Sequence, residues 1–240
     1  MHRQRVSVLV DPLRRLLRRG AVAHAANLLS KLHAADVARL LAFLTDEESD
    51  RTFELLYRDD PAKAAEVLSE MEQADAVRVL EERSSKQVAK ILGELGADDA
   101  AELVSALPDE VAQGVLSELE LTGQPQVEDL LGYEEETAGR IMSPQVFALP
   151  VETSVSAAID RLRSKSAEDL EMVFYLYGVD ESGRLMGVCS LRDLLLHRPD
   201  ARLGELMSER PVSVGVDTDQ EEVAHLVARY NYLALPVVDH

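Results

Sequence analysis

The sequence predicts an α + α/β protein: an all-α domain of short helical repeats, followed by a mixed α/β region. First, apolar pairs recur every twelve residues between about residues 43 and 116. Second, from about residue 140, runs rich in β-branched and aromatic residues alternate with helical stripes. Third, aromatic residues make up only 4% of the chain and Trp is absent, which favours helices packed through Ala and Leu.

The composition excludes several classes of partner. The 44 acidic and 25 basic residues give a net charge of −19, which argues against nucleic acid and favours cations or basic partners. Between Glu94 and Glu136 there are thirteen acidic residues and no Lys, Arg or His. The single Cys189 cannot form an internal disulfide, and no stretch of about 18 apolar residues or secretory signal is present. We therefore expect a cytoplasmic location.

Residues typical of helix ends mark both ends of the first predicted helix. Asp11 is a candidate cap, Pro12 would occupy the first helical position, and Gly20 would close the helix. An apolar stripe of Leu13, Leu16 and Leu17 lies opposite a face of arginines. Two interpretations stay open: a surface helix docked on the domain, or a contact with an anionic surface.

The repeat follows, with a period that holds about two helical turns and a connection. Helices this short cannot bury a face alone, so neighbouring repeats must stack. Asp98-Asp99 and Pro108-Asp109 stand where new helices should begin. The apolar pairs are Phe43-Leu44, Leu55-Leu56, Val67-Leu68, Val79-Leu80, Ile91-Leu92, Leu103-Val104 and Val115-Leu116.

A cluster of helix-breaking residues at Thr122–Pro125 ends the repeat, and a sequence pattern typical of mixed α/β structure begins near residue 140. The second β-α-β theme stops at His240, where the first has its turn and second hairpin strand, so we expect the second unit to be incomplete. The predicted elements are a strand at Val146–Leu149, a helix at Ser154–Lys165, a hairpin of Met172–Val179 and Leu185–Ser190 around Asp180–Gly183, a helix at Leu191–His197, a strand at Pro211–Val216, a helix at Asp219–Tyr230 and a strand at Ala234–Val238.

Two tandem β-α-β-β-α units of this kind resemble CBS domains, which are nucleotide-sensing modules that pair head to head. The residues that carry the resemblance are Ile141–Pro144, Gly183–Val188 and Ser190–Asp193 in the first unit, and Met207-Ser208 and Leu235–Asp239 in the second.

The combination with the helical repeat is similar to the MgtE family of magnesium channels. The carrying segments are Ala64–Leu68, Glu136–Met142 and Asp217–Ala224. The resemblance implies a right-handed superhelix of short helical repeats followed by a CBS pair. The implied domains are an N-terminal repeat domain at 1–132, a linker at 133–138, a first CBS domain at 139–200 and a truncated second CBS domain at 201–240.

The resemblance also implies a function. The chain would be the cytoplasmic Mg²⁺-sensing and gating part of a homodimeric channel, paired through its CBS domains and joined to a transmembrane pore domain. Mg²⁺ would bridge acidic faces and favour the closed state, and ATP or another adenine nucleotide would bind the CBS pair. The alternative is a free-standing adaptor that binds a protein partner and senses adenylates. We expect no enzyme, because the sequence has no Gly-rich phosphate loop or G-x-S-x-G elbow.

Mg²⁺ takes hard oxygen ligands and often only one or two carboxylates, so no tight motif is required. The family usually has Asp where this chain has Asn231, which should weaken that site. For each acid the alternative is an ordinary exposed helix residue. The magnesium ligands implied by the resemblance are Asp98 and Glu102 with Glu66 in the repeat domain, and Glu221, the backbone carbonyl of Ala228 and Asn231 in the second CBS unit.

The resemblance places a nucleotide on the first CBS unit. Asp193, at the end of a Ser-x-x-Asp element, would hold the ribose, Arg192 would approach the phosphates, and Tyr175 would line the base pocket. The alternative is that Asp193 caps the helix Leu194–His197. The equivalent aspartate of the second unit would lie beyond His240, so we expect one complete half-site.

Overall fold

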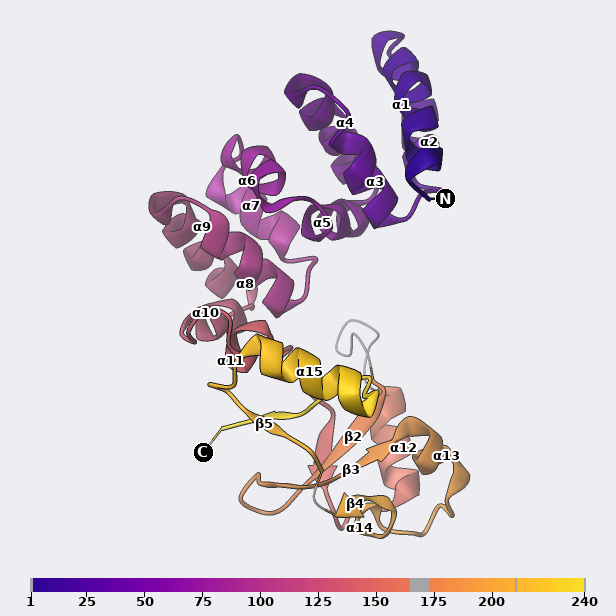
Figure 1. The fold of residues 1–240 in the computed structure, drawn as a ribbon, viewed down its shortest axis with the longest axis vertical. Coiled ribbons are helices and arrows are strands. Elements are labelled where there is room, and N and C mark those ends of the chain that lie inside the picture. The colour runs from indigo at the N-terminus through magenta and orange to yellow at the C-terminus, as the bar shows by residue number, and fades with distance from the viewer. Residues whose placement is uncertain (1, 165–172, 210, 240) are drawn as a thin grey trace. The chain divides into compact units, whose positions relative to one another are not determined.

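The chain forms two compact units, residues Met1–Glu128 and Asp129–His240 (Figure 1). The structure, a computed structural model, describes residues 2–164, 173–209 and 211–239, with side chains for 8–164, 173–208 and 211–239. Lys165 and Met172, which end two of the predicted elements, lie outside the described residues.

The first unit is a series of short helices, as predicted. From α5 to α9 the helices begin at intervals of twelve residues, which confirms the predicted period. The helices are α1 (His2–Arg18), α2 (Val22–Leu29), α3 (Ala34–Leu41), α4 (Asp46–Asp59), α5 (Pro61–Ser69), α6 (Gln73–Glu81), α7 (Ser85–Leu92), α8 (Ala97–Ala106) and α9 (Asp109–Thr122), with α10 (Gln126–Leu131) after them.

The helices stack in two interleaved layers. Contacts join α1 to α3, α3 to α5, α5 to α7 and α7 to α9, while α2 contacts α4 and α6 contacts α8. The pairs Val67-Leu68, Val79-Leu80 and Ile91-Leu92 are fully buried between them. Gly114 of α9 lies so close to α7 that an added Cβ would stand 2.5 Å from Ser85 Oγ. Small residues at the contacts therefore let short helices approach closely enough to share one core.

The period is interrupted once. Helix α4 has 14 residues, so the start of α5 is delayed by about one helical turn. The predicted pair Phe43-Leu44 is consequently out of phase with the helices: it lies in the turn after α3, and Phe43 is 55% exposed. The buried pair at the equivalent place is Leu40-Leu41.

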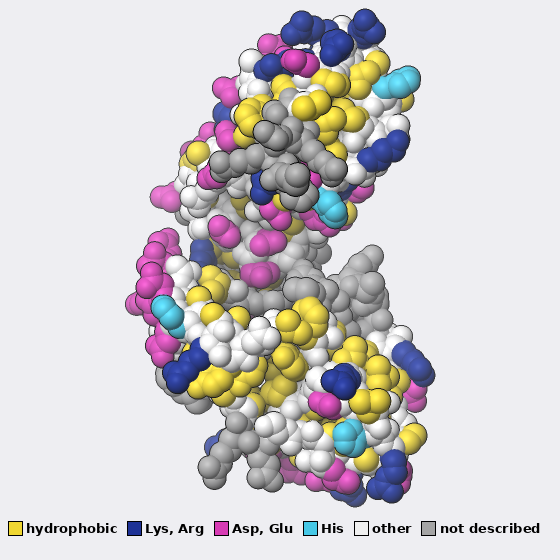
Figure 2. Space-filling model, turned by 45° about the vertical axis from the view of Figure 1, so that its right-hand side comes forward, with side chains coloured by type: hydrophobic (Ala, Val, Ile, Leu, Met, Phe, Trp, Pro, Cys, Tyr) yellow, Lys and Arg dark blue, Asp and Glu magenta, His cyan; other side chains and the backbone are white. Residues whose placement is uncertain are grey.

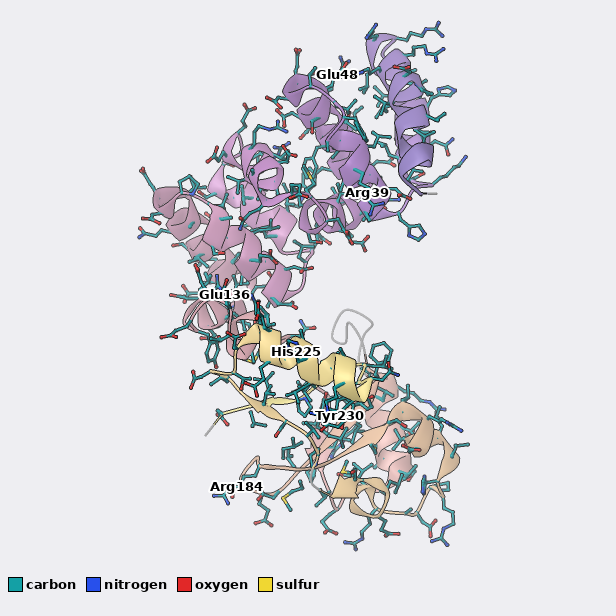
Figure 3. All side chains as sticks on the ribbon, viewed as in Figure 1. Arg39, Glu48, Glu136, Arg184, His225 and Tyr230 are labelled. Atoms are coloured by element: carbon teal, nitrogen blue, oxygen red, sulfur yellow. The ribbon has the colours of Figure 1, made fainter. Side chains whose placement is uncertain are left out.

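The first helix is longer than predicted. It begins at His2, so Pro12 lies inside it and not at its first position, which makes that prediction wrong. Gly20 does end the turn after the helix, with a φ of 64° that favours glycine. Leu13 and Leu17 are buried against the unit, as expected for a docked helix. Arg14 Nε donates to Glu48 Oε2 on α4 at 2.9 Å, and this contact lowers the pKa of Glu48 (Figure 3).

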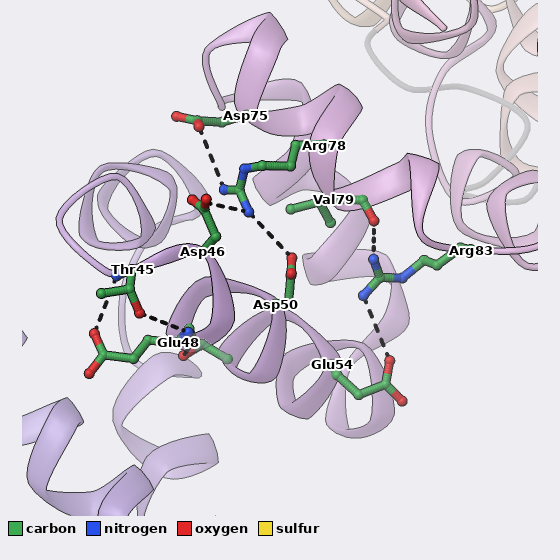
Figure 4. A network of polar contacts seen from close by, with 10 residues as sticks. Thr45, Asp46, Glu48, Asp50, Glu54, Asp75, Arg78, Val79 and Arg83 are labelled. Carbon is green, nitrogen blue, oxygen red and sulfur yellow. Dashed lines mark hydrogen bonds and ion pairs between the residues drawn. The ribbon is translucent and has the colours of Figure 1, made fainter. Parts of the chain in front are cut away.

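A polar network joins α4 to α6 (Figure 4). The guanidinium of Arg78 lies 3.4 Å from Asp46, 3.7 Å from Asp50 and 3.6 Å from Asp75. Burial of the Asp50 carboxyl raises its pKa, and the charge of Arg78 opposes the rise. One cation therefore holds three carboxylates.

Arg83 holds the other end of α4. It donates to the carbonyl of Val79 at the end of α6, pairs with Glu54 and covers the ring of Phe53 at 4.9 Å (Figure 4). A cation at a helix C-terminus complements the helix dipole, and its stem shields an aromatic side chain.

The second unit is the predicted mixed α/β region. A four-stranded sheet has the order β1-β2-β3-β4, with β1 parallel to β2 and the other pairs antiparallel, and β5 is parallel to β6 in a second sheet. The hairpin strand Leu185–Ser190 has the predicted bounds. The elements are α11 (Ala138–Ile141), β1 (Ala148–Pro150), α12 (Val155–Ser164), β2 (Tyr175–Val179), β3 (Leu185–Ser190), α13 (Leu191–Leu196), α14 (Leu203–Leu206), β4 (Ser208–Glu209), β5 (Val214–Gly215), α15 (Gln220–Tyr230) and β6 (Val237–Val238).

The two halves of this unit exchange their entry segments. The backbone of residues 136–139, ahead of the first half, hydrogen-bonds to residues 216–220 of the second. Residues 201–204, ahead of the second half, hydrogen-bond in the same way to residues 151–155. Beside them, the N–H of Ser156 donates to the carbonyl of Pro199. Part of the segment predicted as a linker, residues 133–138, is therefore bound into the fold.

Leu80 of α6 tests the shared core of the first unit, because its side chain is fully buried. We expect Leu80→Ala to lower the free energy of unfolding by about 2–5 kcal/mol, through lost burial and a cavity. The control Leu121→Ala, at a position that is 81% exposed, should change it by less than about 0.5 kcal/mol. Urea unfolding followed by circular dichroism measures both, and equal losses would contradict the stacking.

The entry segments of the second unit offer a matched pair of glycines. An added Cβ at Gly139 would meet Tyr133 Cδ1 at 2.7 Å and the carbonyl oxygen of Val216 at 3.1 Å, whereas at Gly204 the nearest atoms are at 3.6 Å. We expect Gly139→Ala to cost about 1–3 kcal/mol of stability through overpacking. Gly204→Ala should be neutral or stabilising, because Ala favours the helix. Thermal unfolding of the two variants compares them, and the reverse ranking would refute the exchange of segments.

Candidate functional site

An acidic hollow lies on the surface of the first unit, where α8 begins beside the end of α5. It is an open depression whose polar wall holds the carboxylates of Asp99 and Glu102, one turn apart on α8. The lining residues are Leu68, Ser69, Met71, Gln73, Asp99, Glu102 and Leu103. The apolar part of this lining belongs to the repeat core, so the hollow is a product of the stacking.

The charge around Asp99 is unfavourable. Its pKa is raised above the ordinary value, first by partial desolvation of the carboxyl and then by repulsion from Asp98, Glu102 and Glu70. The Asp99 side chain is exposed, but its carboxyl group is still desolvated enough for this to be the largest cause of the raised pKa. A bound cation would relieve both effects.

The predicted ligands of this domain fall in different places. Glu102 lines the hollow, whereas Asp98 does not line it and acts on Asp99 only through its charge. Glu66 is exposed on α5 and is not among the lining residues. Sequence reasoning missed Asp99 and Glu70, although Asp99 stands three residues before Glu102, a spacing that also shares a helix face.

The donor set suits a hydrated ion better than a caged one. Among the residues that the structure describes, no group of three or more His, Cys, Asp or Glu side chains gathers closely enough to hold a metal ion by itself. Mg²⁺ keeps several waters and takes one or two carboxylates, so Asp99 and Glu102 are an adequate set for it.

The second set of predicted ligands lies on α15. The N–H of Glu221, in the first turn, donates to Asp219 Oδ1 at 2.7 Å, and the Glu221 side chain is exposed. At the other end, the N–H of Tyr232 donates to Val227 at 3.2 Å, so the carbonyl of Ala228 lacks the donor four residues on that a continuing helix would supply. The carbonyl of Ala228 is therefore suited to accept a ligand.

Asn231 ends α15 with a φ of 53°, in the left-handed region that Asn adopts more readily than most residues. Its identity is thus explained by the helix end. Seven residues of helix rise separate Glu221 from Ala228 by about 10 Å, which is too far for both to ligate one Mg²⁺ at its usual distance of about 2 Å. Glu221 would therefore need an ion separate from one at Ala228. Figure 3 shows the same helix with His225 and Tyr230 labelled.

The predicted nucleotide residues lie at the start of α13. Ser190 is the N-cap: its hydroxyl accepts from the N–H of Asp193 at 3.1 Å and donates to Asp193 Oδ2 at 2.6 Å. This hydrogen bond is the largest cause of the lowered pKa of Asp193, whose carboxylate is therefore ionised at neutral pH. The cap is thus Ser190, and Asp193 keeps acceptor capacity for a hydroxyl group.

Tyr175 and Arg192 flank this aspartate. Tyr175 pairs with Ser190 across the β2–β3 ladder, and the N–H of Leu191 donates to the carbonyl of Phe174 at 3.1 Å. Arg192 is exposed and lies near enough to lower the pKa of Asp193. The structure therefore brings Tyr175 and Asp193 together at one end of the sheet, with an exposed cationic side chain beside them.

Among the described residues, no helix is both long enough and apolar enough to cross a membrane.

Family models match both units. The MgtE intracellular N domain matches residues 32–136, and the CBS domain matches residues 138–200 and 203–240. The chain is 47% identical over 114 residues to the magnesium transporter MgtE of Thermus thermophilus, which covers 48% of this chain and 25% of that protein. It is 40% identical over 124 residues to MgtE of Bacillus subtilis, with coverages of 52% and 27%. The aligned region thus spans about a quarter of these curated relatives.

Solved structures match nearly the whole chain. The cytosolic domain of the Mg²⁺ channel MgtE in complex with ATP has a TM-score of 0.88 and 36% identity, over 97% of this chain and 93% of that one. The soluble part of a magnesium transporter has a TM-score of 0.81 and 28% identity, over 98% and 91%. The helical unit, the CBS pair and these alignments agree, and the chain belongs to the MgtE family.

Proposed function

We propose that this chain is the cytoplasmic Mg²⁺-sensing and gating module of a magnesium channel. The observation that carries the proposal is the acidic hollow, where the pKa of Asp99 is raised by desolvation and by three neighbouring carboxylates. Such a cluster costs stability at neutral pH, because the ionised form of Asp99 is disfavoured in the folded state. A divalent cation turns that cost into binding free energy.

The proposed mechanism is an equilibrium between two states. Without Mg²⁺ the acidic faces repel one another, and with Mg²⁺ they are bridged and the closed state is favoured. A ligand shifts such an equilibrium only by its difference in affinity for the two states. Because the interaction is between charges, we expect this difference to decrease as ionic strength rises.

The other parts of the proposal concern partners. The module acts as a regulator and not as an enzyme, joined to a transmembrane pore domain. The CBS pair forms a homodimer, for which the exposed side chains Leu195 and Leu196 on α13 and Leu233 after α15 supply apolar surface. An adenine nucleotide binds at Asp193, with Tyr175 and Arg192 beside it. The named complex of a relative with ATP supports this assignment.

Neutralising the two carboxylates of the hollow should show separately how much they lower folding stability and how much they contribute to Mg²⁺ binding. In Mg²⁺-free buffer at neutral pH, we expect Asp99→Asn/Glu102→Gln to raise the melting temperature by a few degrees, because a 1 kcal/mol gain in a chain of this size shifts it by about 2–4 °C. The same variant should show a smaller rise in melting temperature when Mg²⁺ is added. Differential scanning fluorimetry with a Mg²⁺ titration measures both effects.

The matched control is Asp109→Asn/Glu110→Gln, in the first turn of α9, where two exposed acids occupy a similar helix position. It changes the net charge equally and should leave the Mg²⁺ response intact. Sedimentation and small-angle scattering in the same titration report the molar mass and the compaction expected of the dimer. A double variant in the hollow that responds to Mg²⁺ like the wild type would refute the site.

Asp193→Asn tests the nucleotide assignment. We expect ATP affinity to fall about tenfold, since a hydrogen bond to a charged acceptor contributes about 1.5–3 kcal/mol. The control Glu181→Gln, at an exposed position in the β2–β3 turn, should bind ATP as the wild type does. Isothermal titration calorimetry gives the affinities, and thermal unfolding of the free proteins detects any loss of the Ser190 cap. Unchanged affinity with lowered stability would mean that Asp193 serves the helix alone.

A further inference from the structure

The charge of this chain is divided between its ends. Residues 1–45 contain eight Lys or Arg and two Asp or Glu, whereas the other 195 residues contain seventeen basic and forty-two acidic. The start of an acidic protein is thus basic. The magnesium proposal makes no use of this segment.

Three arginines near the end of α1 are exposed: Arg15, Arg18 and Arg19. Within the described residues, no ion pair joins them to a carboxylate, whereas the neighbouring Arg14 is bound to Glu48 and to the carbonyl of Phe43. Arg15 Nε donates to the backbone carbonyl of Asp11 at 3.4 Å, and Arg18 acts on Glu48 only through its charge. The three exposed charges can therefore still meet a partner, whereas Arg14 has a structural role.

Exposed apolar side chains accompany the arginines. Val8 precedes Arg15 by seven residues, so the helical period places these two on one face of α1, and Arg19 follows the end of the helix. Val22 opens α2 just after the turn at Gly20, and Phe43 is held next to Arg14 through its carbonyl. Val8 is 69% exposed and Val22 50%. We call Arg15, Arg18, Arg19, Val8, Val22 and Phe43 the basic edge. Figure 2 shows basic and hydrophobic side chains together at the α1 end of the unit.

If the basic edge were an ordinary solvent-exposed surface, its charged side chains would be expected but its exposed apolar side chains would not. Arginines interspersed with exposed Val and Phe are typical of surfaces that lie on anionic lipid, where the cations meet headgroups and the apolar groups reach the acyl boundary. The acidic remainder does not forbid this contact, because charges beyond about 10 Å are largely screened at 0.1 M salt. Nucleic acid is a poorer fit, since the edge lacks aromatic stacking groups other than Phe43.

We infer that the basic edge docks on the surface of an anionic membrane. The contact is peripheral and reversible, with three arginines as its electrostatic part and three apolar side chains as its shallow anchor. It requires neither the acidic hollow nor Mg²⁺, and so goes beyond the sensing function.

The test is co-sedimentation of the 240-residue chain with vesicles of phosphatidylcholine, with or without phosphatidylglycerol. The buffer contains a chelator, because divalent ions could bridge acidic side chains to lipid. We expect binding to the anionic vesicles only, weakening as salt is raised. Each basic residue at such a surface contributes about fivefold in affinity, so Arg15→Glu/Arg18→Glu/Arg19→Glu should bind about 100-fold more weakly.

The matched control is Arg58→Glu/Arg161→Glu/Arg184→Glu, which reverses three exposed arginines elsewhere and makes the same change in net charge. It should retain vesicle binding. Phe43→Ser should weaken binding several-fold, whereas Leu121→Ser, at another exposed apolar position, should not. Circular dichroism verifies that each variant is folded.

Two results with vesicles would overturn the inference: no binding of the wild type to anionic vesicles, or an equal loss of vesicle binding in the control triple variant. A third would be a basic-edge variant that binds vesicles normally but has a lower molar mass in sedimentation. The last would identify a second copy of the chain as the partner. A failed Mg²⁺ response leaves vesicle binding unaffected, so the two proposals fail separately.

Discussion

The structure of the first unit depends on one constraint: a helix of eight to ten residues cannot bury an apolar stripe without neighbours. Each repeat therefore presents its apolar pair to the helices two places before and after it, as Ile91-Leu92 of α7 does between α5 and α9. Stability is distributed over these contacts between neighbours. The solvent side of every helix is thereby left without a packing role, and it can carry charge.

That freedom explains where the acids lie. Arg78 and Arg83 balance the carboxylates between α4 and α6, where packing requires it. After Lys90 no basic residue follows until Arg140, and neighbouring carboxylates repel the Asp99 carboxylate on α8. The raised pKa of Asp99 shows that its ionised form is unfavourable in this arrangement. It is a cost that folding by itself does not require, which is why it points to a ligand.

The second unit follows a different constraint, the exchange of entry segments between its halves. Residues 136–139 complete the second half, and residues 201–204 complete the first, so neither half is a separate module. Gly139 allows the tight approach to Tyr133 and Val216 that this exchange needs. The nucleotide candidate at Ser190 and Asp193 lies on the more regular sheet, where the β2–β3 ladder holds Tyr175 opposite Ser190.

The sequence by itself determined the local features: the twelve-residue period, the glycine that ends the turn after α1, and the bounds of β3, because each depends on periodicity or on the conformational preference of one residue. Tertiary structure decided the rest. The extra turn of α4 moved Phe43 out of the core. The stacking of the repeats placed Asp99 and Glu102 beside the end of α5, and pairing across the second unit absorbed part of the predicted linker. These outcomes depend on contacts between residues that are far apart in the sequence. Such contacts form only when the helices and strands pack against one another.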